Sequence, residues 1–449
     1  MSRCVLGTNQ DDFSRKPPCK RCILQSHLDY TGAEADSFSF HRDETLAAAI
    51  QHLSVDELKQ ATHAGIPLGA IVLPSMRWRL RLHNLTDDES TRFLYREFIL
   101  SAWNVAREFT VLMERTDPQA VVVFNGQFFP EATVRWLCLQ REIRVVTHEV
   151  GLLPLTGYFT TGEATAYPIR IPDTFELNEE QNARLDAYLE KRFQGKFSMA
   201  GIQFWPEMKG LGQAFLQKAA GFKQIVPVFT NVIFDTSQPH ANTIFSDMFV
   251  WLEMIVELAR LHPETLFVIR AHPDETRPGK ESQETVENWV NKRAVTDLPN
   301  VVFISPREYF SSYELIQLSK FIMIYNSTIG LEASIMGAAV LCAGKARFTQ
   351  YPAVFFPQSM ADFRAQAEAF LAAEKINVPA DFRRNARRFL YYQLFRTSLP
   401  FDAYLEPAQN ISSVYLKDFD WKSLFPEASP TIQTLLDGIL HGGDFLLRE

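Results

Sequence analysis

A short polar cluster follows a strand-like run in the C-terminal half of this chain. The apolar residues 266–269 lead into Arg270, then His272 and Pro273. Pro273 cannot continue a β-ladder and fixes a turn, so both side chains should stand at the end of the strand. A guanidinium and an imidazole there suit charge-assisted hydrogen bonds to a phosphate. The structural alternative is a histidine whose ring is hydrogen-bonded to the backbone, next to a solvent-exposed arginine.

A second cluster follows the apolar run Phe321–Tyr325, where Asn326, Ser327 and Thr328 precede a predicted helix. Free N–H groups and the helix dipole at such a start attract anions, and hydroxyls add donors. Glu332, one turn further on, could accept from ribose hydroxyls. The structural alternatives are a plain helix cap for Ser327 and a solvated carboxylate for Glu332. Because two strand ends carry phosphate-type groups together, we interpret this edge as a phosphate site.

Further polar residues could contribute to the same edge. Asn231 follows the strand Gln224–Phe229, and Ser312 with Tyr313 opens a short helix, where the phenol ring could pack on a base. A structural role explains these residues equally well.

Two strand ends in the first half carry candidates for acid–base chemistry. Asn125-Gly126 ends one predicted strand, and His148-Glu149 ends another. A carboxylate or histidine at a strand end can act as a general base towards the hydroxyl group of an acceptor substrate. Glu149 is our first choice for such a base and His148 the reserve, with Asn125 and Gly126 on the acceptor side. The alternative is a hydrogen-bonding role between domains.

These clusters need sheets that bring strand ends together. Short β-branched runs alternate with helical patterns, which predicts an α/β fold with parallel sheets. The predicted strands are 70–73, 120–124, 144–147, 224–229, 266–270, 301–304, 321–325 and 340–342. The predicted helices are 87–115, 179–193, 245–262, 283–292, 313–318, 331–336 and 360–373. Arg77, Arg79 and Arg81 alternate with apolar residues, as in a half-exposed strand.

The pattern divides into four parts. We expect an N-terminal Rossmann-like acceptor domain over 1–200. Residues 1–40 offer no convincing first strand, so either the chain starts late or this domain is abbreviated. A connection over 201–223 leads to a Rossmann-like donor domain over 224–375. A helical extension over 376–449 should pack back on both domains.

Composition narrows the function classes. The 449 residues suit two domains, and the net charge of −8 argues against nucleic-acid binding. Five cysteines do not suggest a disulfide framework, and no apolar run approaches the roughly 18 residues of a membrane span. We expect a cytoplasmic protein. The basic, aromatic run 383–392 could meet anionic headgroups at the inner face of a membrane or an acidic acceptor; the structural alternative is a solvated face with interdomain pairs.

Cys19 and Cys22 form the one pattern that suggests a metal. No second Cys/His pair stands at the usual spacing, so we expect no metal site.

The chain resembles bacterial capsule-polysaccharide glycosyltransferases of the two-Rossmann GT-B fold, which include Kdo transferases and are related to sialyltransferases with a His-Pro motif. The resemblance is carried by Arg270-x-His-Pro-x-Glu275, Ser311-Ser-Tyr-Glu-Leu315 and Tyr325-Asn-Ser-Thr-x-Gly-Leu-Glu332. It covers 225–350 well and 125–151 loosely. His148-Glu149-Val150-Gly151 matches the acidic base motif of the sialyltransferases imperfectly.

The resemblance implies an enzyme that moves a sugar from a nucleotide-activated donor to a glycan or lipid-linked acceptor in surface polysaccharide synthesis. It also implies a donor in the C-terminal domain, with His272 and Ser327/Thr328 on its phosphates, and an acceptor-side base in the N-terminal domain. From the residues themselves we add Arg270, Glu275 and Asn326 to the donor groups. We expect no cofactor and no divalent metal, because the helix start and the basic groups can take the charge. The alternatives are a CDP-glycerol-type phosphotransferase, a nucleotide-sugar epimerase of similar double fold and a non-catalytic nucleotide-binding protein. Fold alone does not separate them.

Overall fold

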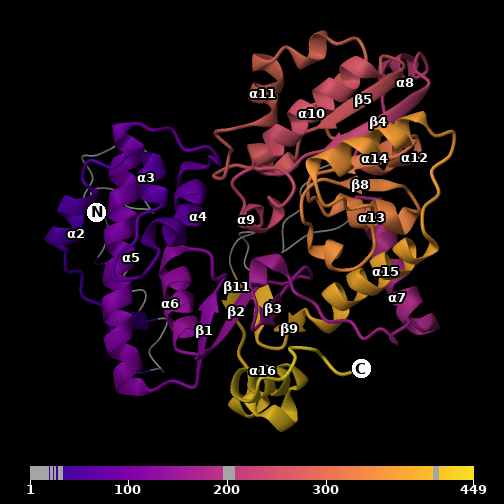
Figure 1. The fold of residues 1–449 in the computed structure, drawn as a ribbon. Coiled ribbons are helices and arrows are strands. Elements are labelled where there is room, and N and C mark those ends of the chain that lie inside the picture. Colours follow the sequence, from indigo (N-terminus) through magenta and orange to yellow (C-terminus); the bar gives the residue numbers. More distant parts are fainter. Residues whose placement is uncertain (1–19, 21–23, 25–26, 29–33, 196–207, 408–413) are drawn as a thin grey trace.

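The computed structural model describes residues 20, 24, 27, 28, 34–195, 208–407 and 414–449. Within them the chain forms two α/β halves, each built around its own sheet (Figure 1). The predicted α/β class with two Rossmann-like halves is thereby confirmed. Among the described residues we find no helix with the length and apolar character to cross a bilayer.

The second sheet is parallel throughout and has the strand order β6-β5-β4-β7-β8. Its strands are β4 (Gln224–Phe229), β5 (Thr265–Arg270), β6 (Val301–Ile304), β7 (Ile322–Ile324) and β8 (Val340–Cys342). Strands β5 and β7 are buried along their whole length, as continuous apolar runs require. The order reverses between β4 and β7, and such sheets bind ligands at the carboxyl ends beside this reversal.

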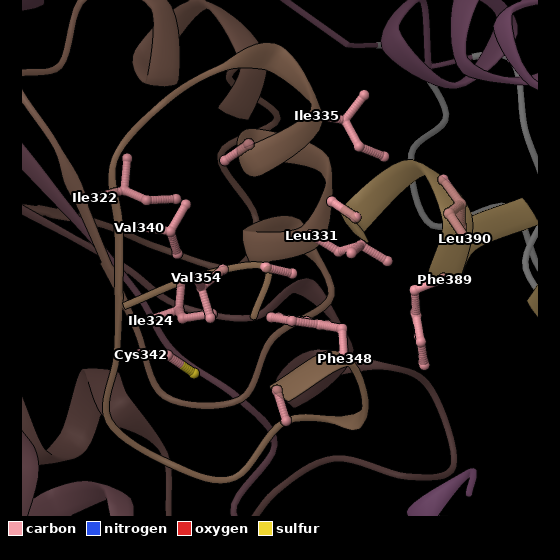
Figure 2. Packing of buried hydrophobic residues seen from close by; sticks show 14 of the residues in the cluster. Ile322, Ile324, Leu331, Ile335, Val340, Cys342, Phe348, Val354, Phe389 and Leu390 are labelled. Atoms are coloured by element: carbon pink, nitrogen blue, oxygen red, sulfur yellow. The ribbon is translucent and has the colours of Figure 1, made fainter. Parts of the chain in front are cut away.

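Helices cover both faces of this sheet. They are α8 (Gln213–Ala219), α9 (Gln238–Ala241), α10 (Met248–Leu261), α11 (Val286–Lys292), α12 (Ser312–Gln317), α13 (Ile329–Met336), α14 (Met360–Ala372) and α15 (Ala380–Tyr391). On one face α10 and α14 share a buried cluster with the strands. On the other, Leu331 of α13 lies between Ile324 of β7 and Phe389 of α15 (Figure 2).

Gly330 explains how closely α13 approaches the sheet. A Cβ at this position would stand 2.2 Å from the side chain of Ile324 and 3.3 Å from that of Phe348. The glycine therefore serves helix–sheet packing beneath the start of α13.

The first sheet is smaller and mixed, with the order β1-β2-β3-β9. Strands β1 (Ala120–Phe124) and β2 (Arg144–Val150) are parallel, whereas β3 (Thr156–Thr160) runs antiparallel to β2 and to β9 (Leu399–Pro400). Most of the segment on which the prediction of an abbreviated first half rested, residues 1–33, lies outside the described residues, so that prediction stays untested. Its helices are α2 (Glu44–Ile50), α3 (Val55–Lys59), α4 (Leu68–Leu80), α5 (Glu89–Thr116) and α6 (Phe129–Gln140).

The predicted strand 70–73 is wrong, because these residues lie inside α4. Arg77 and Arg79 belong to the same helix and Arg81 caps it in a left-handed conformation, so their alternation is not that of a strand. Helix α4 packs on α5 and α6 in one apolar cluster. The short β-branched run Ile71–Val72 is read as a strand from the sequence, yet the helix partners decide its conformation.

Segments from the middle and from the C-terminal part of the chain cross between the halves. Helix α7 (Glu179–Phe193) lies beside α15. Arg384 and Arg387 of α15 pair with Glu176 and Asp186, so this basic run is engaged within the chain. After a π-helical turn, Tyr392–Arg396, the chain adds β9 to the first sheet and ends with α16 (Pro430–His441) near β1.

Short elements complete the description. They are the 3-10 turns η1 (Ala164–Ala166), η2 (Pro273–Thr276), η3 (Val295–Asp297), η4 (Arg347–Gln350), η6 (Trp421–Leu424) and η7 (Pro426–Ala428), with a hairpin of β10 (Leu405–Pro407) and β11 (Val414–Leu416).

Candidate functional site

A hollow of about 470 Å³ lies between the two halves. The second half lines it with the loops that follow β4, β5, β7 and β8, which is the edge predicted to bind ligands. The first half contributes Trp78 from α4 and the loop around η1. The lining includes Trp78, Thr165, Asn231, Asp235, His240, His272, Asp274, Arg277, Lys280, Asn326, Ser327, Thr328, Lys345 and Arg347.

The start of α13 opens into this hollow. Thr328 occupies the cap position without a side-chain capping bond, and Ser327 is 8% exposed. Neither hydroxyl makes a hydrogen bond within the described part of the chain. The backbone N–H of Asn326 donates to Oδ1 of Asn231 at 3.2 Å, which ties this loop to the end of β4. Two hydroxyls and a helix N-terminus are therefore available to an anion.

His272 stands beside this helix start, in the lining of the same hollow. Its Nδ1 accepts the backbone N–H of Asp274 at 3.2 Å. This bond assigns the proton of the neutral ring to Nε2, which becomes a donor. Burial lowers the pKa of His272, while Asp274 and Asp235 oppose that shift. The ring is therefore neutral near pH 7.

Cations converge on the hollow from two loops. Lys280 lies 4.8 Å from the ring centre of Trp78, and Arg347 lies 3.9 Å from that of Tyr167. Together with Lys345 they line the hollow, and none of the three forms a salt bridge with a carboxylate among the described residues. Arg277, by contrast, is 3.8 Å from Asp274. The unpaired cations give the hollow an attraction for negative charge.

A smaller cavity of about 110 Å³ adjoins the hollow and shares His272, Ser327 and Thr328 with it. Glu332 lines this cavity but is only 3% exposed. Its carboxylate accepts from Arg192 Nε at 2.7 Å and from the hydroxyl of Tyr313 at 2.5 Å. The predicted contact between Glu332 and a ribose is therefore not supported, because the carboxylate is hydrogen-bonded to Arg192 and Tyr313.

Ser312 and Tyr313 also line the smaller cavity. The ring of Tyr313 packs edge-on against Phe193, with ring centres 4.8 Å apart. Its hydroxyl holds Glu332, so the residue joins α12 to α13 as well as bordering the cavity.

Two members of the Arg270–Glu275 motif support the loops. The guanidinium of Arg270 donates to the carbonyls of Glu308 and Phe310 at 3.3 and 2.9 Å, and burial lowers its pKa to about 10. Glu275 is fully buried, accepts the N–H of Val286, and has its pKa raised by burial to about 8. The prediction that Glu275 contacts the donor is wrong, because Glu275 lines neither cavity. Arg270 is hydrogen-bonded to the backbone of a neighbouring loop.

The strand ends of the first sheet form a separate group. Asn125, in a left-handed conformation before Gly126, donates from Nδ2 to Oε1 of Glu149. Burial raises the pKa of Glu149, against that hydrogen bond. Asp235 and Arg347 act on this carboxyl electrostatically, so it lies near the hollow, but it is not among the residues that line it.

His148 points away from Glu149, because neighbouring strand residues face opposite sides of a sheet. Its ring stacks on Phe159 at 5.2 Å and meets the edge of Phe124 at 5.4 Å. Burial lowers its pKa. His148, the second candidate for the general base, therefore lies in an aromatic cluster on the face of the sheet opposite to Glu149.

Several residues that line the hollow were not predicted from the sequence. Lys345 and Arg347 follow the strand Val340–Cys342, so the strand-end argument applied to His272 would have found them. Trp78 was hidden by the mistaken strand, and His240 lies in a loop without a recognisable pattern.

Metal ligation finds no support in the described residues, where no group of three His, Cys, Asp or Glu side chains could hold an ion. Cys138 and Cys342 are buried free thiols. The pair Cys19 and Cys22 lies outside the described residues.

Comparisons with known proteins give fold likenesses at low similarity. No protein-family model matches the sequence, and no curated protein matches it. A Thermosulfurimonas dismutans KpsC, a beta Kdo 2,4 transferase, is 12% identical with a TM-score of 0.39, covering 62% of this chain and 79% of its own. UDP-GlcNAc 2-epimerase from Neisseria meningitidis, bound to UDP-GlcNAc, is 15% identical with a TM-score of 0.25, covering 72% and 96%.

Proposed function

We propose that this protein is a glycosyltransferase that uses a nucleotide-activated sugar. One observation supports this most: the start of α13, His272 and three unpaired cations share one hollow between two Rossmann-like halves. The hollow has room for a phosphorylated donor, and small-molecule sites commonly measure about 300–1,000 Å³. Its position between the halves leaves the acceptor to approach from the first half.

In the proposed reaction an acceptor hydroxyl attacks the anomeric carbon while the bond to the phosphate oxygen breaks. His272 Nε2–H, the hydroxyls of Ser327 and Thr328 and the first-turn N–H groups of α13 would stabilise the negative charge on the leaving phosphate. Asn231 would hold the loop through Asn326. Lys280, Lys345 and Arg347 can neutralise further charge, so the proposal requires no divalent metal.

The acceptor in this proposal is a glycan or a lipid-linked saccharide of surface polysaccharide synthesis. A base on the opposite side of the anomeric carbon would make the transfer inverting. The enzyme would then work in the cytoplasm, at the inner face of the bacterial membrane when its acceptor is lipid-linked.

The test is slow donor hydrolysis. The purified protein is incubated with CMP-, UDP-, GDP- and dTDP-sugars and with CDP-glycerol, and nucleotide release is followed. Release from one sugar donor, accelerated by an acceptor, is the expected result. Turnover of CDP-glycerol alone would indicate a phosphotransferase. Thermal stabilisation by a nucleotide without turnover of any donor or acceptor pair would leave only a binding protein.

A further inference from the structure

Apart from its lysines and arginines, the hollow is lined by four titratable side chains: Asp235, His240, His272 and Asp274. His272 and Asp274 are joined to each other through the backbone of Asp274, and Asp274 also faces Arg277. Asp235 accepts the N–H of Ser237 at 3.0 Å and shapes its own loop. His240 differs from these three because its partners come from the other half of the molecule.

His240 belongs to α9 in the second half, and its Nε2 reaches into the first half. It lies 2.8 Å from Oγ1 of Thr165 and 3.2 Å from Oε2 of Glu163. Oε1 of Glu163 lies 3.0 Å from Nη1 of Arg135, and Gln127 donates to Oε2 at 3.2 Å. The carboxylate is thus fixed by first-half residues and aimed at a second-half ring.

This arrangement assigns the tautomer of the ring. Three groups surround Nε2: Glu163 Oε2, Thr165 Oγ1 at 2.8 Å and Gln127 Nε2 at 3.5 Å. A carboxylate only accepts, and Gln127 already donates to that carboxylate, so we assign the proton of neutral His240 to Nε2. In this tautomer the Thr165 hydroxyl accepts at Nε2. Nδ1 is left with its lone pair, and no hydrogen bond to it occurs within the described part of the chain. A carboxylate that orients an imidazole in this way is a recurrent device of general-base catalysis.

We propose that His240 is the general base of the transfer and that Glu163 is its positioning residue. This inference rests on the proposed function. It replaces Glu149, whose carboxylate is bonded to Asn125 outside the lining of the hollow. Because ring and carboxylate belong to different halves, the pair is complete only when the halves meet.

The step balances without another reactant. The acceptor hydroxyl gives its proton to Nδ1 of His240, and its oxygen forms the bond to the anomeric carbon. The bond from that carbon to the phosphate oxygen breaks, and the electron pair stays on the phosphate beside His272. The protonated ring is stabilised by Glu163 until the product leaves.

The charges around His240 are compatible with this role. Burial lowers the pKa of the ring most, Glu163 raises it, and Lys345, Arg135 and Arg347 lower it. The ring is therefore neutral at pH 7 and able to accept a proton. Activity should rise with pH along an acidic limb as His240 loses its proton.

The test compares His240→Ala and His240→Gln with the wild-type enzyme and with His262→Ala, a surface histidine beside Glu264. We expect His240→Ala to lower kcat about 10²–10⁴-fold, the usual contribution of a general base. Donor Kd should change less than about threefold. Added imidazole should restore part of kcat in His240→Ala, and the acidic limb should vanish. His240→Gln, which preserves much of the side-chain volume, should be equally slow.

Glu163→Gln provides the positioning readout. It should lower kcat about tenfold and move the acidic limb to lower pH, because the carboxylate no longer raises the pKa of the ring.

Three results would overturn the assignment. Normal kcat with weakened donor binding in His240→Ala would make His240 a contact between the halves. An acidic limb retained in His240→Ala but lost in Glu149→Gln would return the base to Glu149. Absence of turnover by the wild-type enzyme on the whole donor panel would remove both the proposed function and this base.

Discussion

The strand ends of the two sheets carry similar polar residues but use them differently. At the second sheet, Ser327 and Thr328 leave their hydroxyls without protein partners beside an open hollow. At the first sheet, Asn125 and Glu149 bond to each other, and His148 is stacked on Phe159. The residue types alone therefore do not make a site.

The difference lies in the loops that leave each sheet. The second sheet is parallel throughout, so its loops gather on one edge around the reversal at β4. In the first sheet β3 returns antiparallel to β2 and pairs alongside its last four residues, Thr147 to Val150. The first half reaches the hollow mainly through η1 and Trp78 instead.

The largest effect is expected for Arg192→Met, which tests whether Glu332 at the second sheet serves the fold or a ligand. Removing one partner of the buried pair leaves the Glu332 carboxylate uncompensated, and we expect a loss of about 3–5 kcal/mol in the free energy of unfolding. Urea unfolding measures this. Arg384→Met, at an exposed pair, should cost less than about 1 kcal/mol. A small loss in Arg192→Met together with abolished nucleotide binding would show that Glu332 serves a ligand rather than the fold.

His272→Ala comes next. Loss of one preorganised donor to the leaving phosphate should reduce kcat about 10²–10³-fold. Steady-state kinetics on the donor found in the panel measures this, with thermal unfolding as the check on the fold. His262→Ala is the matched control and should be near normal. A near-normal rate in His272→Ala would remove the imidazole from the mechanism.

Glu275→Gln tests a group at the end of β5 that is used structurally. Since burial raises the pKa of Glu275 to about 8, the folded state holds a proton that the unfolded state has lost. Wild-type stability should fall as pH rises, by about 2 kcal/mol between about pH 6 and pH 7.5 from this group alone. Glu275→Gln should lack that part of the slope in urea unfolding at several pH values. Identical slopes in the two proteins would mean that Glu275 ionises normally.

Ser327→Ala should have the smallest effect. One lost hydrogen bond to a phosphate should weaken nucleotide binding about tenfold, measured by calorimetry. Ser359→Ala removes a hydroxyl that caps α14, so it should lower stability by about 1 kcal/mol and leave binding unchanged. Loss of stability without loss of binding in Ser327→Ala, or loss of binding in Ser359→Ala, would contradict the view that the start of α13 is open to a ligand while that of α14 is capped.

Much of the second half could be predicted from the sequence. Strands 224–229, 301–304 and 340–342 are confirmed at both ends, because buried parallel strands are continuous apolar runs between polar turns. Helix 179–193, which precedes the second half in the chain, is confirmed as well, and Asn178 and Gln181 form its capping box. The same logic placed His272, Ser327 and Thr328 beside one hollow.

The rest depends on contacts between distant segments. Nothing local in Ile71–Val72 shows that α5 and α6 will hold it as a helix. Glu332 looks exposed in sequence, and only the fold brings Arg192 to it across 140 positions. The proposed role of His240 depends on Glu163 in the other half, and the sequence spacing of the two residues does not predict that they meet.

The two-residue strand β9 has a consequence for how the molecule is made. It closes the edge of the first sheet beside β3, yet it is encoded at residues 399 and 400. Chains grow from the N-terminus, so the second half has emerged from the ribosome before the first sheet can be finished. Until then the outer edge of β3 is open to pairing with other chains, and the nascent protein is most exposed to aggregation during that interval.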